Sequence, residues 1–447
     1  RALIAALAPT GTRIEVARPA FTIVQDYDEL RVPVRHADLY RIASLAEIAE
    51  LDLDAAERML IVEWPERGEW RRLADRLEIS LTGSGTTRLI RLQGFGYWAT
   101  SLERTFAIAR FLQAANFADF SRRFLQGDAS FRRYERLVGE GRSFILMDMP
   151  ARPDGPPIAG GRSYSKIAHL AEDIAAVLAV NAALRAFGYS APDTHDFDLK
   201  QGLAIIEDLG DDVFGHKYAA GKPPIEPLRT AVALLADMAR REWPRHVKAD
   251  GGHGHTVPDY DEEAQLIEVD LLLSWMWPRL QGSPAPGPVA DEFRAIWKAL
   301  LPLTRKAPPV WGLRDFHSPN LLWLPARSGI ARVGLIDTQD CVMGDPAYDL
   351  VSLLQDARVD VDEGTMRELF DLYCQLRADD RGFDRASFAA SFAVLGAQRA
   401  TKILGIFSRL SMRDGKHGYL AHIPRVSRYL EMNLEHGALA PLRAAHR

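Results

Sequence analysis

Residues 311–324 read WGLRDFHSPNLLWL and set Asp315 and Asn320 five positions apart between two apolar runs. The next apolar run, VGLI at 333–336, ends on Asp337. In ATP-dependent phosphoryl transfer, one carboxylate accepts the proton of the attacking hydroxyl, while an amide and a second carboxylate hold Mg²⁺ on the nucleotide phosphates. The order of these three residues therefore predicts a phosphoryl-transfer site.

A simple hairpin is the alternative interpretation of the same stretch. Asp and Asn are common in turns because their side chains bond nearby backbone, and a Ser-Pro-Asn loop can join two paired strands. A hairpin does not require a further carboxylate at the end of the next strand, as Asp337 is. We therefore favour the phosphoryl-transfer interpretation.

The composition is that of a globular chain long enough for two or three domains, with 447 residues of which 47% are hydrophobic. The net charge of -5 gives no general attraction to nucleic acid, so no direct nucleic-acid contact is expected. Cys341 and Cys374 are far apart and predict neither a disulfide nor a zinc site. No apolar run reaches the length of a membrane span, and we expect a cytoplasmic protein without membrane contact.

Residues 1–92 alternate helical and strand patterns, which predicts an α/β domain with a largely parallel sheet. Glycines between 83 and 96 mark a change in composition, so we expect a linker and a leading helix over 93–116. Two strands, a helix with apolar residues from Ile167 to Leu178 and a further strand predict an N-terminal lobe over 117–209. The remainder, 210–447, is expected to be all-helical except at the catalytic loop.

Several ordered stretches resemble the aminoglycoside phosphotransferase and choline kinase superfamily: GDASFRRYERL, FILMDMP, IIEDLGDD, LRDFHSPNLLWL and GLIDTQDCVMGDPAYDLVSLL. Within it, the nearest resemblance is to kinases of the anomeric hydroxyl of N-acetylmuramate and N-acetylglucosamine. The resemblance implies a two-lobed α+β protein-kinase-like domain that uses ATP and Mg²⁺ on an amino sugar. It also implies that Asp315 is the base, that Asn320 and Asp337 bind Mg²⁺, and that Glu207 to Leu209 form the hinge facing adenine.

The phosphate-binding part of this pattern departs from other kinases. The turn with Gly127 and Ser130 is expected to cover phosphates through its backbone N–H groups. No Lys occurs between Gly127 and Pro150, where a kinase carries its phosphate-pairing lysine, and Met147 takes that position. Arg132 or Arg133 is the candidate replacement, because a guanidinium forks onto phosphate oxygens. The alternative is that both arginines lie on a solvated strand face. Leu313 also stands where many kinases have His.

The charge of the C-terminal region bears on the acceptor. From Ala397 onward there are nine Lys or Arg residues and three acids. A basic lining repels polycationic aminoglycosides and suits an acceptor with a carboxylate, such as the lactyl group of N-acetylmuramate. Arg399 and Lys402, one helical turn apart, are the candidate substrate residues, and a solvated basic face is the alternative. Asp345 before Pro346 has the form of a helix cap and is expected to be structural.

The first domain resembles TsaE, the P-loop ATPase of bacterial threonylcarbamoyladenosine tRNA modification, through PAFTIVQDY, HADLYR and IVEWPERG. The resemblance implies that Asp38 acts near Mg²⁺, that Glu63 positions water, and that the partners are the tRNA-modification proteins. The P-loop expected before the helix at Arg1 is absent, so we expect an incomplete P-loop domain that binds ATP poorly. A pseudokinase or docking protein of the modification complex, and an aminoglycoside or other small-alcohol kinase, are the alternatives to an amino sugar kinase.

Overall fold

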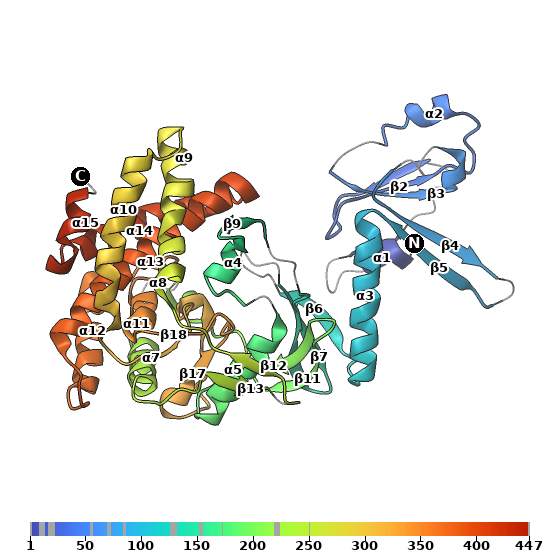
Figure 1. Ribbon diagram of the computed structural model, residues 1–447. Coiled ribbons are helices and arrows are strands. Elements are labelled where there is room, and N and C mark those ends of the chain that lie inside the picture. The colour runs from blue at the N-terminus through green and yellow to red at the C-terminus, as the bar shows by residue number, and fades with distance from the viewer. Residues whose placement is uncertain are drawn as a thin grey trace. The chain divides into compact units, whose positions relative to one another are not determined.

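The computed structural model describes the chain except for residues 1, 9–13, 17–22, 54–56, 69–72, 84–85, 126–131, 152–154, 172, 219–223, 250 and 446–447. The chain divides into two compact units, Arg1–Arg110 and Phe111–Arg447 (Figure 1). Helix α3 (Tyr97–Ala114) runs across this division. No helix in the described ranges is both long and apolar enough to span a membrane.

The first unit contains a small three-stranded sheet in the order β1 (Val24–Tyr27), β2 (Val34–Asp38), β3 (Met59–Glu63). The same unit contains two short helices and one 3-10 turn: α1 (Ala2–Ala6), α2 (Leu45–Ala49) and η1 (Pro65–Arg67). Strands β4 (Arg76–Thr82) and β5 (Leu89–Phe95) form a separate antiparallel pair. The expectation of a largely parallel sheet is wrong, because among the described strands only β2 and β3 pair in parallel.

The second unit begins with a five-stranded antiparallel sheet in the order β11-β12-β8-β7-β6. Its strands are β6 (Ser121–Leu125), β7 (Arg133–Gly139), β8 (Arg142–Asp148), β11 (Thr194–Asp198) and β12 (Leu203–Glu207). The hairpin of β7 and β8 and the strand β12 match the sequence patterns. The edge strands β6 and β11 escaped prediction, since SRRFL and THDFD show no clear alternation of apolar and polar residues.

The predicted helix over 167–178 is two helices in the structure, α4 (Tyr164–Ile167) and α5 (Ile174–Ala186). Between them His169 has a positive φ of 53°, a conformation that cannot continue a helix. Asp173 then caps α5 by accepting hydrogen bonds from the backbone N–H groups of Ala175 and Ala176. The short strands β9 (Pro157–Ala159) and β10 (Arg162–Ser163) precede α4.

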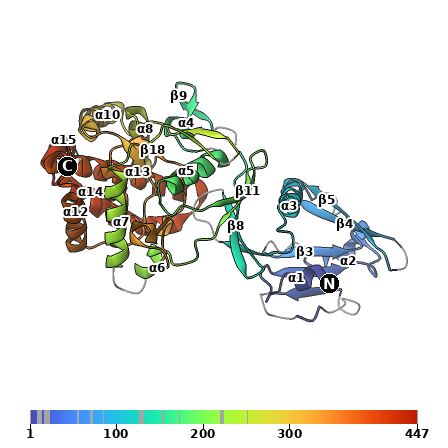
Figure 2. The same cartoon turned by 90° about the horizontal axis from the view of Figure 1, so that it is seen from below.

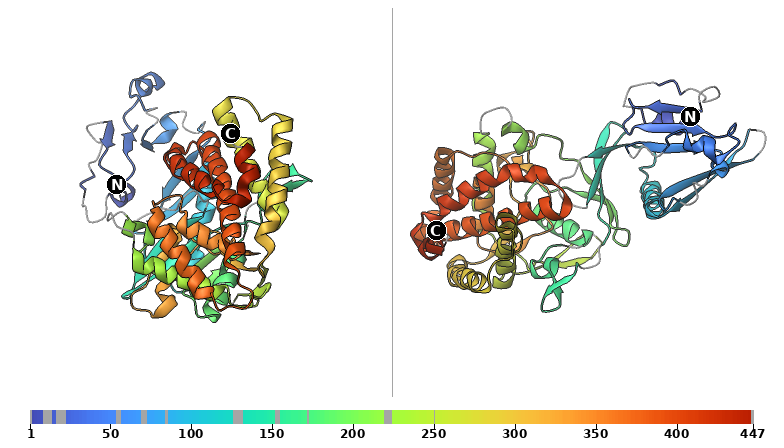
Figure 3. Two further views of the ribbon diagram at one scale, coloured as in Figure 1. Left: turned by 90° about the vertical axis from the view of Figure 1, so that its left-hand side faces the viewer. Right: turned by 90° about the horizontal axis from the view of Figure 1, so that it is seen from above.

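The rest of the second unit is mainly helical, and its helices gather away from the five-stranded sheet (Figure 2, Figure 3). They are α6 (Phe214–Tyr218), α7 (Ile225–Met238), α8 (Glu262–Leu271), the π-helix η3 (Leu272–Met276), α9 (Trp277–Gln281), α10 (Gly287–Leu300), α11 (Ala347–Leu354), α12 (Glu363–Arg377), α13 (Arg385–Asp414), α14 (Ile423–Leu434) and α15 (Ala440–Ala445). Short 3-10 helices lie at η4 (Leu301–Arg305), η5 (Ser318–Asn320), η6 (Gly329–Arg332), η7 (His417–His422) and η8 (Gly437–Leu439). The expected two-lobed α+β fold is confirmed.

Three short strand pairs interrupt this lobe, so the expectation of an all-helical remainder is wrong. They are β13 (His246–Lys248) with β14 (Gly254–Thr256), β15 (Val310–Gly312) with β18 (Val342–Gly344), and β16 (Leu321–Trp323) with β17 (Val333–Leu335). The strands on either side of the catalytic loop, β15 and β16, each pair with a later strand and not with each other. The hairpin interpretation of residues 311–324 is therefore wrong.

Candidate active site

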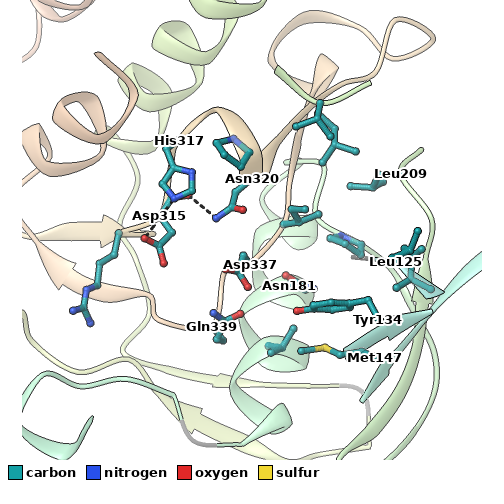
Figure 4. A pocket seen from close by; sticks show the side chains of 18 of the residues that line it. Leu125, Tyr134, Met147, Asn181, Leu209, Asp315, His317, Asn320, Asp337 and Gln339 are labelled. Atoms are coloured by element: carbon teal, nitrogen blue, oxygen red, sulfur yellow. Dashed lines mark hydrogen bonds and ion pairs between the residues drawn. The ribbon is translucent and has the colours of Figure 1, made fainter. Parts of the chain in front are cut away.

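A cavity of about 540 Å³ in the second unit collects most of the predicted site residues. Its walls come from the sheet, the segment after β12, the loop after β15, and one face of α13 (Figure 4). The lining includes Asp315, Asn320, Asp337, Glu207, Leu209, Arg399 and Lys402. Glu207 and Lys402, 195 positions apart in the sequence, thus face one space.

Two carboxylates hold the loop that carries Asp315. Asp349, on α11, accepts hydrogen bonds from the backbone N–H groups of Leu313 at 2.6 Å and Arg314 at 2.9 Å. Asp356 accepts from the N–H of Ser318 at 2.8 Å. Arg314 has a φ of 66°, a strained conformation for a non-glycine residue that these contacts maintain. Leu313 stands where many kinases have His, and here its backbone N–H holds the loop through Asp349.

Asp315 is ionised at neutral pH. Burial alone would raise the pKa of Asp315, but the surrounding groups, among them Lys402 and Arg399, outweigh it and hold the pKa below its usual value. The backbone C=O of Asp315 accepts a hydrogen bond from Asn320 Nδ2 at 3.1 Å, which orients the amide. A carboxylate in this state is able to accept a proton from a hydroxyl placed in the cavity.

Asp337 and Asn320 offer oxygen atoms suited to Mg²⁺. Burial and the nearby charge of Asp315 raise the pKa of Asp337 to about 6, although Arg132 lowers it. Arg132 stands 2.5 Å from Asp337 Oδ1, so a cation already lies against this carboxylate in the structure. A second cation here would also reduce the repulsion between the carboxylates of Asp337 and Asp315. Mg²⁺ needs few ligands from the protein, because water and phosphate oxygens complete its coordination. The donor set therefore fits the ion.

The structure separates the two candidate arginines. Neither arginine is part of the cavity lining, but Arg132 contacts Asp337, which does line it, whereas Arg133 is exposed at the start of β7. Met147, at the position of the missing lysine, is 1% exposed and lines the cavity. Gly127 and Ser130 fall outside the described residues.

The segment after β12 is fixed by an arginine that the sequence analysis did not single out. Arg136, on β7, pairs with Asp208 at 2.7 Å and with Asp211 at 2.7 Å. The side chain of Glu207 is engaged with Arg327 at 2.7 Å. Glu207 and Leu209 both line the cavity, but the Glu207 carboxylate is already paired.

A buried ionic cluster lies behind the catalytic loop. Glu268, on α8, is 0% exposed and pairs with Lys402 at 2.8 Å and with Arg314. Burial opposes the charge of Glu268, yet Lys402 and Arg314 lower its pKa to about 2. Lys402 is thus committed to Glu268, while Arg399 on the same face of α13 has no such partner among the described residues. Nothing in the spacing of Glu268 in the sequence signals this role.

In the first unit, Asp38 and Glu63 are register neighbours at the ends of the parallel strands β2 and β3. Asp38 Oδ1 accepts a hydrogen bond from the Tyr40 N–H at 3.0 Å, as in an ordinary turn. Glu63 Oε1 lies 3.0 Å from Nε2 of the buried His36, which the sequence analysis missed. The structure therefore brings the two acids together, each with a local partner.

Family models match both parts of the chain. Residues 121–388 match the model of the phosphotransferase enzyme family. The chain belongs to this family. Residues 1–90 match the model of the threonylcarbamoyl adenosine biosynthesis protein TsaE, so the chain joins a TsaE-type segment to a phosphotransferase segment.

Known relatives of the phosphotransferase segment are similar over nearly their whole length. An N-acetylmuramate/N-acetylglucosamine kinase of Caulobacter vibrioides is 37% identical over 77% of this chain and 96% of its own. A protein of the same name from Neisseria meningitidis is 31% identical over 73% of this chain and 90% of its own. Among solved structures, a choline/ethanolamine kinase family protein of Mesorhizobium loti has a TM-score of 0.48 and 16% identity, over 77% of this chain and 98% of its own.

Proposed function

We propose that the second unit transfers the γ-phosphoryl group of ATP to the anomeric hydroxyl of N-acetylmuramate or N-acetylglucosamine. The observation that carries the proposal is the meeting of Asp315, Asn320 and Asp337 in one cavity with a basic wall from α13. The similarity to kinases named for these two sugars supports the choice of acceptor. Because the reaction consumes ATP, we place it in the cytoplasm.

In the proposed reaction, the sugar hydroxyl oxygen forms a bond to the γ-phosphorus while the bond to the β,γ-bridging oxygen breaks and ADP leaves. Asp315 accepts the hydroxyl proton, and such assistance contributes roughly a hundred- to ten-thousand-fold. Asn320 and Asp337 would hold Mg²⁺, which neutralises phosphate charge when bound. Arg132 supplies positive charge next to Asp337, in place of the usual lysine.

The nucleotide end of the cavity is proposed from the family resemblance. In this scheme the backbone from Glu207 to Leu209 faces adenine, since the Glu207 side chain is already paired with Arg327. The turn with Gly127 and Ser130, which lies outside the described residues, would cover the phosphates. Arg136 keeps the hinge in position through Asp208 and Asp211.

A product analysis with a blocked acceptor tests the proposal. The purified chain is incubated with ATP, Mg²⁺ and either N-acetylglucosamine or its methyl glycoside, which has no free anomeric hydroxyl. We expect ADP release with the free sugar only, and loss of its reducing-end reactivity until a phosphatase restores it. Equal turnover of the methyl glycoside would refute the anomeric position, and turnover of aminoglycosides alone would refute the acceptor class.

The first unit suggests a second role. We propose that it serves partners of threonylcarbamoyladenosine tRNA modification, because residues 1–90 match TsaE and Asp38 and Glu63 lie together at the strand ends. Co-purification of the chain with those partner proteins tests this role. Retention of the partners by a Glu63→Gln, Asp38→Asn variant would show that the two acids are not needed for docking, and failure of the parent chain to bind them would refute it.

A further inference from the structure

Arg399 is a buried cation without a partner of its own. Its side chain on α13 is 5% exposed and lines the cavity. Among the residues that the structure describes, it forms no hydrogen bond and no ion pair. The carboxylates of Asp315 and Asp349 act on it only from beyond ion-pair distance. A guanidinium kept in this state beside an open space is typical of a site that binds an anionic ligand.

Lys402, one helical turn away, differs in this respect. Its Nζ lies 2.8 Å from Glu268 Oε1 and 3.3 Å from the Tyr348 hydroxyl. Burial and the nearby charge of Arg314 lower the pKa of Lys402, but Glu268 raises it. The pKa of Lys402 therefore lies above its usual value. Lys402 is therefore neutralised inside the protein, whereas Arg399, which lines the same cavity, forms no ion pair with any residue that the structure describes.

Arg399 acts on residues of the catalytic loop. Its charge lowers the pKa of Asp315 and of His317, both on the catalytic loop. The cation that acts on Asp337, at the phosphate end, is Arg132. Arg132 thus contacts Asp337, the metal candidate, while Arg399 acts on Asp315, the proposed base.

The wall around Arg399 is apolar and rigid. Ile403, Ile406 and Phe407 follow it at helical spacing and line the same cavity. Helix α13 is pressed against α8 at Gly405, where an added Cβ would lie 2.4 Å from the backbone carbon of Leu271. The guanidinium is therefore presented from a fixed backbone, which suits recognition of one planar anion.

We propose that Arg399 binds the carboxylate of the lactyl group of N-acetylmuramate and so sets the preference between this sugar and N-acetylglucosamine. The inference rests on the proposed function. A guanidinium and a carboxylate form two parallel hydrogen bonds, whereas N-acetylglucosamine carries only a hydroxyl at that position. Arg399 is a substrate-binding residue in this scheme, and Lys402 is a positioning residue that acts through Glu268.

The test compares kcat/KM on both sugars for the parent chain, Arg399→Gln and the control Arg409→Gln. Arg409 lies on the same helix, is partly buried over the Tyr164 ring and does not line the cavity. A hydrogen bond to a charged group is worth about 1.5–3 kcal/mol, so Arg399→Gln should lose about 10- to 150-fold on N-acetylmuramate, mainly in KM. The loss on N-acetylglucosamine should be clearly smaller, since that sugar offers Arg399 no carboxylate, and Arg409→Gln should leave the ratio of the two sugars unchanged.

Equal loss on both sugars, or no loss on either, would overturn the inference while leaving the proposed function intact. A parent chain that phosphorylates neither sugar would overturn the proposed function, and the inference with it. Folding is checked by the thermal midpoint without ligand. A clear fall in the midpoint of Arg399→Gln would show that Arg399 is instead a structural residue.

Discussion

Replacing Glu268 by Gln removes the negative charge that Arg314 and Lys402 share inside the protein. Glu268 also accepts hydrogen bonds from the Tyr260 hydroxyl at 2.5 Å and from Gln398 Nε2 at 3.0 Å. Breaking a buried ion pair by removing one partner costs about 3–5 kcal/mol, because an uncompensated charge remains. Unfolding entropy of about 2.1 cal/mol/K per residue converts this to a fall of roughly 4–7 °C in the midpoint of the second unit.

The pH range in which this stabilisation exists follows from the pKa of Glu268. Its folded pKa of about 2 lies below the ordinary value of 4.5. The unfolded chain therefore takes up protons first as the pH falls, and the contribution of Glu268 is complete above about 4.5 and is lost as the pH falls toward about 2. Calorimetry at pH 7 measures the full effect of Glu268→Gln, and the difference from the parent should shrink below pH 4.5.

A second variant separates the cluster from ordinary loss of packing. Lys402→Met should be milder than Glu268→Gln, because Glu268 keeps Arg314, Tyr260 and Gln398. Glu268→Gln alone leaves both Arg314 and Lys402 without their carboxylate, whereas the double variant leaves only Arg314. The double variant should therefore be less destabilised than the sum of the two single variants, by about 0.5–3 kcal/mol. Strict additivity, or a Glu268→Gln midpoint within about 1 °C of the parent, would refute the reasoning.

Further predictions concern the catalytic loop, the phosphate end and the buried carboxylate of Asp345, which precedes Pro346, the N-cap of α11. Asp315→Asn should fold normally and lose roughly a hundred- to ten-thousand-fold in sugar-dependent ADP release, and full activity would remove Asp315 from the mechanism. Arg132→Gln should lose about 10- to 150-fold in kcat/KM for ATP, with Arg133→Gln as a nearly silent control, and equal effects would contradict the assignment. Burial raises the pKa of Asp345 to about 6, so the parent loses up to about 3 kcal/mol of stability as the pH rises from about 4 through 6. Asp345→Asn should lack this loss, and unfolding midpoints at pH 5 and 8 that shift by the same amount in both proteins would contradict it.

The catalytic loop was predictable because its residues lie close together in the sequence and their chemistry fixes their spacing. Asp315, Asn320 and Asp337 reach one cavity as expected. The choice between Arg132 and Arg133 was not predictable, since adjacent residues at the start of a strand point to opposite faces and the sequence does not fix which face is inward.

The pairing of Lys402 with Glu268 could not be predicted from the sequence, for a different reason. Arg399 and Lys402 look alike in the sequence, as two basic residues on one helical face. They differ only because α8 brings Glu268 against Lys402, a contact between residues 134 positions apart that no local pattern encodes. The edge strands β6 and β11 were missed because their sequences are polar, so their pairing is decided by the neighbouring strands.

The missing lysine bears on whether the second unit is a kinase or a pseudokinase. Protein kinases hold this lysine with a glutamate from the helix that follows, and both must be in place for activity. Here Met147 replaces the lysine, and α5 carries no acidic residue between Ile174 and Ala186. Asn181 of α5 lines the cavity and accepts a hydrogen bond from the Thr338 hydroxyl at 2.6 Å.

Met147 is uncharged and α5 has no acidic residue, so this ion pair cannot form between them. At the same time Arg132 brings a positive charge to Asp337 from the start of β7. In a kinase site that has lost its activity, we would expect either the lysine or the glutamate of this pair to remain without its partner. We would also expect no cation beside the metal candidates Asn320 and Asp337. The coordinated replacement, with Asp315, Asn320 and Asp337 all retained, argues for a working site in which Arg132 takes over the role of the lysine.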